Sequence, residues 1–216
     1  MKKITLICIA LSILVSCANN IDNKNTTDNN EELYSQVLLD SAWTVMEFNS
    51  DHETAKSLLF DALSLEKADT ASIYYALGMA NKFEENYNEA ISYFDNTIQL
   101  DSSETNYFSQ RGMAKQVLKN YDAALADFKK ALSIDSVYTM NYWRLGSFYI
   151  ETEDYENAIL ILNEGIKRNP YNFDPFLMRA IARLNIDSLE SACLDYNKAK
   201  ELGMKETKEE LEKSCN

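Results

Sequence analysis

Histidine is almost absent from this chain, and this limits the chemistry that the chain can support. The only histidine, His52, stands at the start of a predicted helix, with no second histidine, no cysteine partner and no metal-ligand spacing around it. The acids Asp51 and Glu53 and the pair Glu84–Glu85 are most simply solvated helical faces. The sequence contains neither a nucleophile elbow nor a phosphate-binding glycine loop. We therefore expect His52 to be a surface or helix-start residue, and we predict no enzyme, no cofactor and no metal site.

Basic residues are also few relative to acidic ones. The chain has 21 Lys and Arg against 34 Asp and Glu, a formal net charge of −13. A strongly acidic body is repelled by phosphate groups, so we expect no nucleic-acid partner. Anionic lipid head groups would repel it too, so any attachment to a membrane has to come from acyl chains.

Long hydrophobic runs are lacking as well. The apolar stretch at residues 4–15 follows two lysines and is shorter than the ~20 residues that span a bilayer. It is typical of the apolar region of a signal peptide. Residues 14–17 read Leu-Val-Ser-Cys, which resembles the lipobox of bacterial lipoproteins. This resemblance implies that residues 1–16 are removed and that Cys17 receives a diacylglyceryl group. The alternatives are an ordinary signal peptide and a short anchor that happens to contain Cys17.

The segment that follows is rich in Asn and Asp and almost free of apolar residues. Residues 18–30 could not repay the entropy lost on ordering, so we predict a lipidated cysteine and a disordered tether over 17–30. Such a coil would span ~20 Å. Removing residues 1–16 leaves 19 basic and 34 acidic side chains, a net charge near −15. By analogy with enterobacterial sorting, Ala18 after the lipidated cysteine implies the outer membrane; which face it occupies stays open.

Cysteine is scarce once the leader is set aside. Of the four cysteines, Cys8 leaves with the signal peptide and Cys17 is lipidated, which leaves Cys193 and Cys215. Two cysteines in an exported protein favour a disulfide, which would stabilise by ~3 kcal/mol in the chain-entropy model. The alternative is a pair of free thiols.

Glycine is scarce too, but its few occurrences are ordered. Three of the five glycines, Gly78, Gly112 and Gly146, are spaced 34 residues apart. Three tyrosines and three alanines keep the same interval: Tyr87, Tyr121, Tyr155, Ala90, Ala124 and Ala158. This regularity predicts a stack of similar repeats rather than a globular enzyme.

The period divides the chain into repeats of two helices each. With residue 71 as position 1, the first, second, third and fourth repeats cover 71–104, 105–138, 139–172 and 173–204. In the first repeat, apolar residues at 3-and-4 spacing predict one helix before Asn86 and another from Tyr87. A degenerate earlier repeat is placed at 36–69, with helices over 31–48 and 52–65.

The recurring residues resemble the tetratricopeptide repeat. They are Tyr74, Leu77, Gly78, Tyr87, Ala90, Phe94 and Asp101 in the first repeat; Phe108, Gly112, Tyr121, Ala124, Phe128, Ala131 and Asp135 in the second; Tyr142, Leu145, Gly146, Tyr149, Tyr155, Ala158 and Pro170 in the third; and Phe176, Ala180, Ala192, Tyr196 and Ala199 in the fourth. The small residues at the glycine position and at the first alanine position let the two helices of a repeat approach closely. Arg111 and Arg179 replace an apolar residue of the family pattern, and we expect them to weaken their repeats.

The resemblance implies an all-α fold, an α-solenoid of stacked antiparallel helix pairs over residues 31–216. Gly203 is a helix stop, and residues 205–214 read as a short, mostly charged helix within a C-terminal cap over 205–216. Stacks need such a polar cap over their last apolar face. A bridge from Cys215 to Cys193 would pin it to the fourth repeat.

The family resemblance also implies a concave groove lined by the first helix of each repeat. Carried over by position, the candidate groove residues are Tyr75, Met79, Phe83, Asn106, Gln110, Met113, Met140, Trp143, Arg144, Ser147, Leu177, Met178 and Ile181. An aromatic and Met-rich groove suits adaptable peptide binding. The alternative is that several of these side chains only pack against the neighbouring repeat. The family's basic clamp for a carboxylate is not expected, because among these positions only Arg144 matches it.

These features favour a membrane-tethered, non-catalytic scaffold that holds a protein or peptide partner in its groove. Tetratricopeptide lipoproteins of this size serve bacterial envelope machines, such as outer-membrane protein assembly and type IV pilus biogenesis. A second hypothesis is a glycan- or peptidoglycan-associated protein, whose exposed aromatics Trp143, Tyr75 and Tyr142 would stack on sugars. The partner's identity and the oligomeric state stay open.

Overall fold

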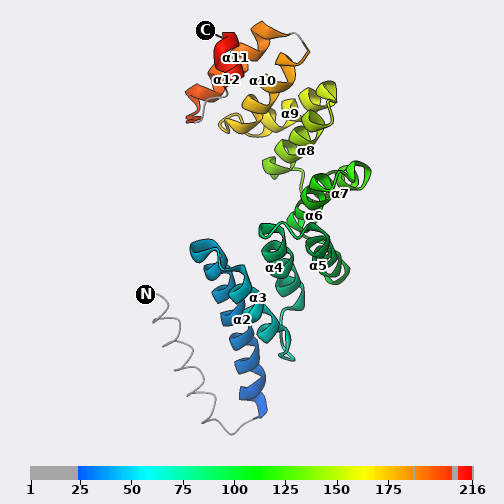
Figure 1. The fold of residues 1–216 in the computed structure, drawn as a ribbon, viewed down its shortest axis with the longest axis vertical. Coiled ribbons are helices and arrows are strands. Elements are labelled where there is room, and N and C mark those ends of the chain that lie inside the picture. The colour runs from blue at the N-terminus through cyan, green and yellow to red at the C-terminus, as the bar shows by residue number, and fades with distance from the viewer. Residues whose placement is uncertain (1–23, 187, 206–208, 216) are drawn as a thin grey trace. The chain divides into compact units, whose positions relative to one another are not determined.

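The computed structural model describes residues 24–186, 188–205 and 209–215, and every regular element in this part of the chain is an α-helix (Figure 1). The predicted signal peptide 1–16, the lipidated Cys17 and residues 18–23 of the predicted tether lie outside the described residues. Among the described residues, no helix combines the length and the apolar character needed to cross a membrane.

Successive helices form the pairs that the period predicts. The helices are α2 (Lys24–Asn49), α3 (His52–Leu63), α4 (Thr70–Phe83), α5 (Tyr87–Leu100), α6 (Thr105–Val117), α7 (Tyr121–Ile134), α8 (Thr139–Glu151), α9 (Tyr155–Arg168), α10 (Asp174–Leu184), α11 (Leu189–Glu201) and α12 (Glu209–Cys215). α2 packs on α3, α4 on α5, α6 on α7, α8 on α9 and α10 on α11. The predicted all-α solenoid of helix pairs is confirmed.

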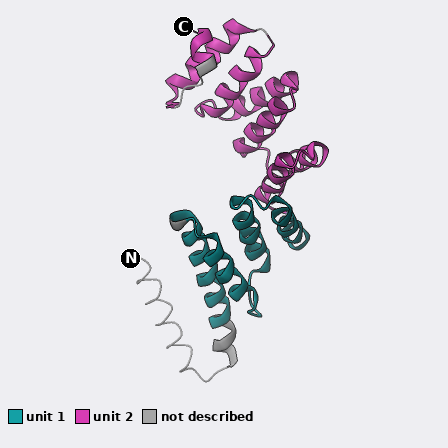
Figure 2. Cartoon of the chain, in the orientation of Figure 1, with its two compact units in different colours: residues 1–102 teal, residues 103–216 magenta. Residues whose placement is uncertain are grey.

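The described helices divide into two compact units, residues 1–102 and 103–216 (Figure 2). The first compact unit has a core of buried leucines and alanines from α2, α3 and α4, such as Leu38, Leu59 and Leu77. In the second, separate clusters form around Phe128 and around Tyr196. Within each compact unit, neighbouring repeats therefore bury apolar faces against one another, as a stack requires.

The three glycines spaced 34 residues apart mark the places where the paired helices touch. A Cβ built on Gly78 would lie 2.5 Å from the Phe94 ring, and one on Gly146 would lie 2.6 Å from Leu162 Cδ2. At Gly112 the nearest atom, on Phe128, is 3.1 Å away. A Cβ at Gly78 or Gly146 would force the facing side chain to move, and one at Gly112 would crowd the Phe128 ring, so glycine fits best at this position.

The turn between the two helices of a repeat has one conformation in the first three repeats. Glu85, Lys119 and Glu153 adopt positive φ angles of 62°, 59° and 59°. In the second repeat, the N–H of Lys119 donates to the Gln116 carbonyl (2.8 Å) and that of Asn120 donates to the Lys115 carbonyl (2.9 Å). This is the Schellman pattern that satisfies the last carbonyls of a helix, here with a non-glycine residue in the left-handed position.

Two predicted boundaries are wrong. α2 begins at Lys24, whereas the sequence predicted tether up to residue 30 and a first helix from residue 31. Nucleation is the costly step in forming a helix. Once residues 34–46 pack as a helix, each polar residue added at its N-terminus costs little free energy, so the helix extends into the Asn-rich segment. At the other end, Lys205 is not helical and the cap helix is described from Glu209.

Candidate binding surface on the first helices

The first helices of successive repeats lie closer together than the second helices do. In the second compact unit, α6 contacts α8 and α8 contacts α10, whereas the described parts of α7, α9 and α11 do not contact one another. A curved stack brings its inner layer together and spreads its outer layer apart. The first helices therefore form the inner, concave layer of this unit, where the groove residues were predicted.

In the first compact unit, two of the predicted groove residues pack inward instead. The Tyr75 ring lies 6.0 Å from Trp43 of α2 and 5.9 Å from Phe94 of α5, measured between centroids. Met79 is buried in the same cluster, beside Ala90 and Phe94. For Tyr75 and Met79, the alternative of packing within the stack describes what the structure shows.

Phe83, the third predicted groove residue of this unit, is half-exposed at the end of α4. Its ring stacks on His52 of α3, with centroids 5.5 Å apart and planes at 19°. Lys82 Nζ lies 5.5 Å from the centre of the same ring. The single histidine thus covers an aromatic side chain, and Phe83 faces a second helix rather than the layer of first helices.

On α6, the predicted residues are covered to different degrees. Gln110 is buried, Asn106 is half-buried, and Met113 packs partly buried against the cluster that contains Phe128 and Phe148. On α8, Met140, Trp143, Arg144 and Ser147 are all half-buried. None of these side chains is fully exposed: apart from the buried Gln110, each is partly covered by its neighbours and partly open to solvent.

The side chain of Trp143 contains a buried hydrogen-bond donor. Its indole Nε1–H is buried and has no hydrogen-bond partner among the described residues. A buried N–H without an acceptor costs about 1–3 kcal/mol. An acceptor brought by a bound partner would remove that cost.

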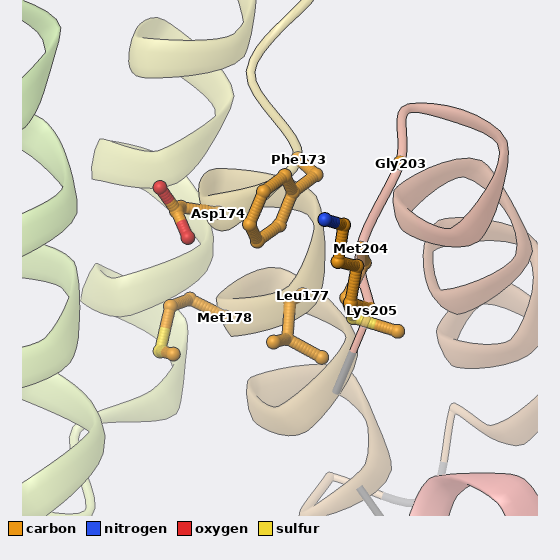
Figure 3. Close-up of a pocket in the computed structure, with 7 residues that line it drawn as sticks. All are labelled: Phe173, Asp174, Leu177, Met178, Gly203, Met204 and Lys205. Atoms are coloured by element: carbon orange, nitrogen blue, oxygen red, sulfur yellow. The ribbon is translucent and has the colours of Figure 1, made fainter. Parts of the chain in front are cut away.

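On α10, the predicted residues line a pocket. Leu177 is buried, Met178 and Ile181 are half-buried, and Leu177 and Met178 belong to the wall of a cavity of about 520 Å³ (Figure 3). Phe173 and Asp174 at the start of α10 complete this wall. The segment Gly203–Lys205, which follows α11, forms the opposite wall.

Gly203 fixes that opposite wall. Its φ of 98° ends α11, and the Met204 N–H donates to the Ala199 carbonyl at 3.1 Å. The same hydrogen-bond pattern as in the turns within the repeats therefore holds Met204 in place, here with the residue best suited to a left-handed conformation. The predicted helix stop at Gly203 is confirmed.

Family comparison agrees with the period read from the sequence. A family model described as the tetratricopeptide repeat matches residues 71–104, 106–138 and 141–172. These three segments are similar to the tetratricopeptide repeat. The matched segments coincide with the first, second and third predicted repeats. The earlier and fourth repeats rest on the packing of α2 with α3 and of α10 with α11.

Solved structures with this fold share little sequence with the chain. MamA from Desulfovibrio magneticus RS-1, solved from residue 41 to its end, has a TM-score of 0.67 and 20% identity, covering 78% of this chain and 94% of that solved chain. YrrB, described as a TPR protein with an unusual peptide-binding site, has a TM-score of 0.62 and 19% identity over 83% and 91% of the chains. PilF from Pseudomonas aeruginosa has a TM-score of 0.71 and 16% identity over 82% and 79%. At these identities the likeness establishes the fold alone. A search of curated proteins finds no match to this sequence.

The second and fourth repeats contain buried ion clusters that sequence reasoning missed. Asp127 is 4% exposed and accepts from Arg111 Nε (2.9 Å), Arg111 Nη2 (2.6 Å) and Lys115 Nζ (2.8 Å). The prediction that Arg111 weakens its repeat overlooked this partner. A carboxylate held by a bidentate arginine and a lysine replaces the apolar contact of the family pattern.

The fourth repeat has the same cluster, an aspartate bound by two basic side chains, at the equivalent positions. Asp195, also 4% exposed, accepts from Arg179 Nε (2.8 Å), Arg179 Nη2 (2.6 Å) and Arg183 Nη1 (2.6 Å). In both repeats the aspartate follows its first arginine by 16 residues and its second cation by 12. That shared spacing is the sequence signal that could have revealed the clusters.

A disulfide joins Cys193 of α11 to Cys215 of α12. α12 has 7 residues, and its Leu211 is buried against Phe176 and Tyr196 of the last repeat. A helix of two turns is not stable alone, so packing and the disulfide hold it over the last apolar face.

Proposed function

We propose that this protein is a non-catalytic scaffold that binds a protein or peptide partner on the concave face of its second compact unit. The observation that carries this proposal is the set of side chains on α8 and α10: half-buried Met and aromatic residues, a buried Trp143 N–H with no acceptor among the described residues, and a pocket beside Leu177. Preformed apolar pockets with a few polar groups suit peptide side chains. The peptide-binding site named for YrrB is in keeping with this proposal.

We further propose that the scaffold is tethered to a bacterial envelope, in the outer membrane, by a lipid on Cys17. The support is the order of basic head, apolar run and lipobox-like Leu14–Cys17 in the sequence. Its net charge of −13 makes acyl chains, rather than head-group attraction, the means of attachment. Metabolic labelling with a clickable fatty acid tests this: Cys17→Ser should lose the label and leave the membrane fraction, and an unchanged label would contradict the tether.

The glycan alternative has less support. Tyr142 is 4% exposed, and its hydroxyl donates to the Ser136 carbonyl at 3.0 Å, so its ring is not available to stack on a sugar. Trp143 and Tyr75 are half-buried. We therefore expect no retention of the protein on purified peptidoglycan sacculi after detergent and high-salt washes, and retention there would favour this alternative.

The groove itself is tested by crosslinking the full chain to its partner in the native envelope. Replacing Trp143 and Met113 together by Ala should reduce the crosslinked product several-fold, because both side chains lie on first helices. A matched variant replaces Leu160 and Leu194, which are 63% and 66% exposed on second helices, by Ala and should leave it unchanged. Equal crosslinking by both variants, each with an intact thermal transition, would contradict the groove.

A further inference from the structure

The pocket at the start of α10 combines an apolar lining with two opposite charges. Phe173, Leu177, Met178 and Met204 supply the apolar lining. Figure 3 shows the Asp174 carboxylate on one side of these side chains and Lys205 on the other. The volume of about 520 Å³ falls within the roughly 300–1,000 Å³ of ligand pockets, so the cavity has room for a bulky side chain of a partner.

Asp174 differs from the two buried aspartates of the same compact unit. Asp127 and Asp195 are each neutralised by two basic side chains. Asp174 is half-buried, and among the described residues it has no ion-pair partner; its backbone N–H donates to Asn172 Oδ1 at 3.0 Å. Burial raises the pKa of the Asp174 carboxyl, partly offset by a hydrogen bond from Asn172. The pocket therefore presents a partly desolvated carboxylate that forms no ion pair within the described part of the chain.

The two charged edges are not equivalent. Lys205 is exposed to solvent, where water screens its interactions, whereas Asp174 is half-buried, where an opposite charge is worth more. The whole chain carries a net charge of −13, which steers basic partners toward it. Both effects favour a partner that carries a positive charge next to the apolar side chain that it inserts into the pocket.

The flexible side chains of the lining suit more than one apolar group. Met178 and Met204 are unbranched and polarizable, so they adapt to aliphatic and aromatic guests. The backbone of Met204 is nevertheless fixed by its hydrogen bond to Ala199. The pocket should thus be tolerant about the shape of the apolar side chain and strict about the neighbouring charge.

We propose that this pocket is the specificity site of the groove: it takes a bulky apolar side chain of a partner segment, and a Lys or Arg adjacent to that side chain pairs with Asp174. This inference rests on the proposed function, because it assigns the chemistry of the peptide that the groove holds. The occupant is a segment of a partner protein, with a basic residue beside Leu, Met or Phe.

A peptide panel tests the proposal with the full mature chain. One polar 12-residue host peptide carries Leu, Phe or Ala at its centre and Lys, Gln or Glu beside it, and affinity is measured by fluorescence anisotropy. We expect Leu-Lys and Phe-Lys to bind tightest and the change from Lys to Glu to weaken binding about tenfold, the equivalent of ~1.4 kcal/mol. Replacing the central Leu by Ala should also weaken binding.

Single substitutions in the pocket test whether these peptide preferences arise there. Asp174→Asn should abolish the preference for Lys over Gln, and Met178→Ala should reduce the preference for Leu over Ala. The matched control Asp122→Asn removes an exposed acid of α7 in the same compact unit and should preserve both preferences. If Asp174→Asn and Asp122→Asn lower the Lys preference equally, the effect is general charge attraction and the proposal is overturned.

Other occupants give other outcomes. Self-association that Met178→Ala disrupts, measured by sedimentation equilibrium, would identify a second copy of this chain and overturn the proposal. Absence of binding by the entire panel would overturn it as well. The proposed function would still stand if Trp143→Ala with Met113→Ala reduced crosslinking to the native partner, so the two failures are distinguishable.

Discussion

At the scale of the residue, backbone conformation separates the turns from the helices that they join. Glu85, Lys119 and Glu153 occupy the left-handed region at an interval of 34 residues, although none of them is glycine. A left-handed conformation costs an L-residue roughly 1–2 kcal/mol, so each turn carries a local penalty that the repeat's packing offsets. This penalty is removable.

Lys119→Gly should stabilise the protein. Relief of the left-handed strain exceeds the entropy that glycine loses on folding, so the free energy of unfolding should rise by about 0.5–1 kcal/mol in chemical denaturation. Lys129→Gly, the same substitution at an exposed helical position of α7, should instead lower it by about 1 kcal/mol. A loss of stability at both positions would contradict the turn geometry.

The contribution of Asp174 to the free energy of unfolding should depend on pH with a sign opposite to that of most aspartates. Burial raises its folded-state pKa, so the ionised carboxylate is penalised in the folded protein at neutral pH. The penalty is full above the folded pKa and disappears as the pH falls below the unfolded value near 3.8. Asp174→Asn should therefore increase the free energy of unfolding at pH 7, and the gain should shrink toward pH 4. A gain that grows on acidification would show the opposite pKa shift.

At the scale of the element, repeats of one fold use two kinds of contact between their paired helices. The second and fourth repeats place a buried aspartate between two cations, whereas the third has Leu145, Tyr149 and Ile161 at the equivalent positions. Sequence periodicity located these helices because small and large apolar residues recur in phase. It missed the ion clusters because their members lie 12 and 16 residues apart on different helices, and only packing shows that they meet.

Asp127→Ala should destabilise the second repeat strongly. It leaves Arg111 and Lys115 without their shared carboxylate, which costs about 3–5 kcal/mol in a buried pair. Transplanting the third repeat's set, as Arg111→Leu, Lys115→Tyr and Asp127→Ile together, should restore unfolding free energy to about the wild-type value. Chemical denaturation of the three proteins decides this, and a triple variant as unstable as Asp127→Ala would show that the apolar set cannot replace the cluster.

The cap helix depends on its covalent link. Cys193→Ser should lower the melting temperature under non-reducing conditions, because the disulfide to Cys215 contributes ~3 kcal/mol in the chain-entropy model. In reductant, the wild-type protein and the variant should melt together. An equal loss in both conditions would mean that the thiols are not bridged in the purified protein.

At the scale of the whole molecule, the sequence predicts the architecture better than it predicts the binding surface. The repeats and their helix pairs follow from the spacing of the recurring residues and the family resemblance, and the stop at Gly203 follows from the conformational freedom of glycine. The groove positions came from the family pattern, which does not say how a particular side chain turns. Tyr75 and Met79 pack inward against Trp43 and Phe94, and Phe83 turns toward His52. The pocket on α10 depends on Met204, which follows α11 at the very end of the fourth repeat and occupies none of the recurring positions of the repeat pattern.

The central claim is that the first helices of the second compact unit hold the partner, and site-specific photocrosslinking tests it most directly. A photoreactive amino acid is placed, one position at a time, at Met140 and Ile181 on first helices and at Leu160 and Leu194 on second helices, in the full chain in its native envelope. We predict an adduct with one and the same protein from Met140 and Ile181 and none from Leu160 or Leu194. The same adduct from the second-helix positions, or an adduct from those positions alone, would contradict the account.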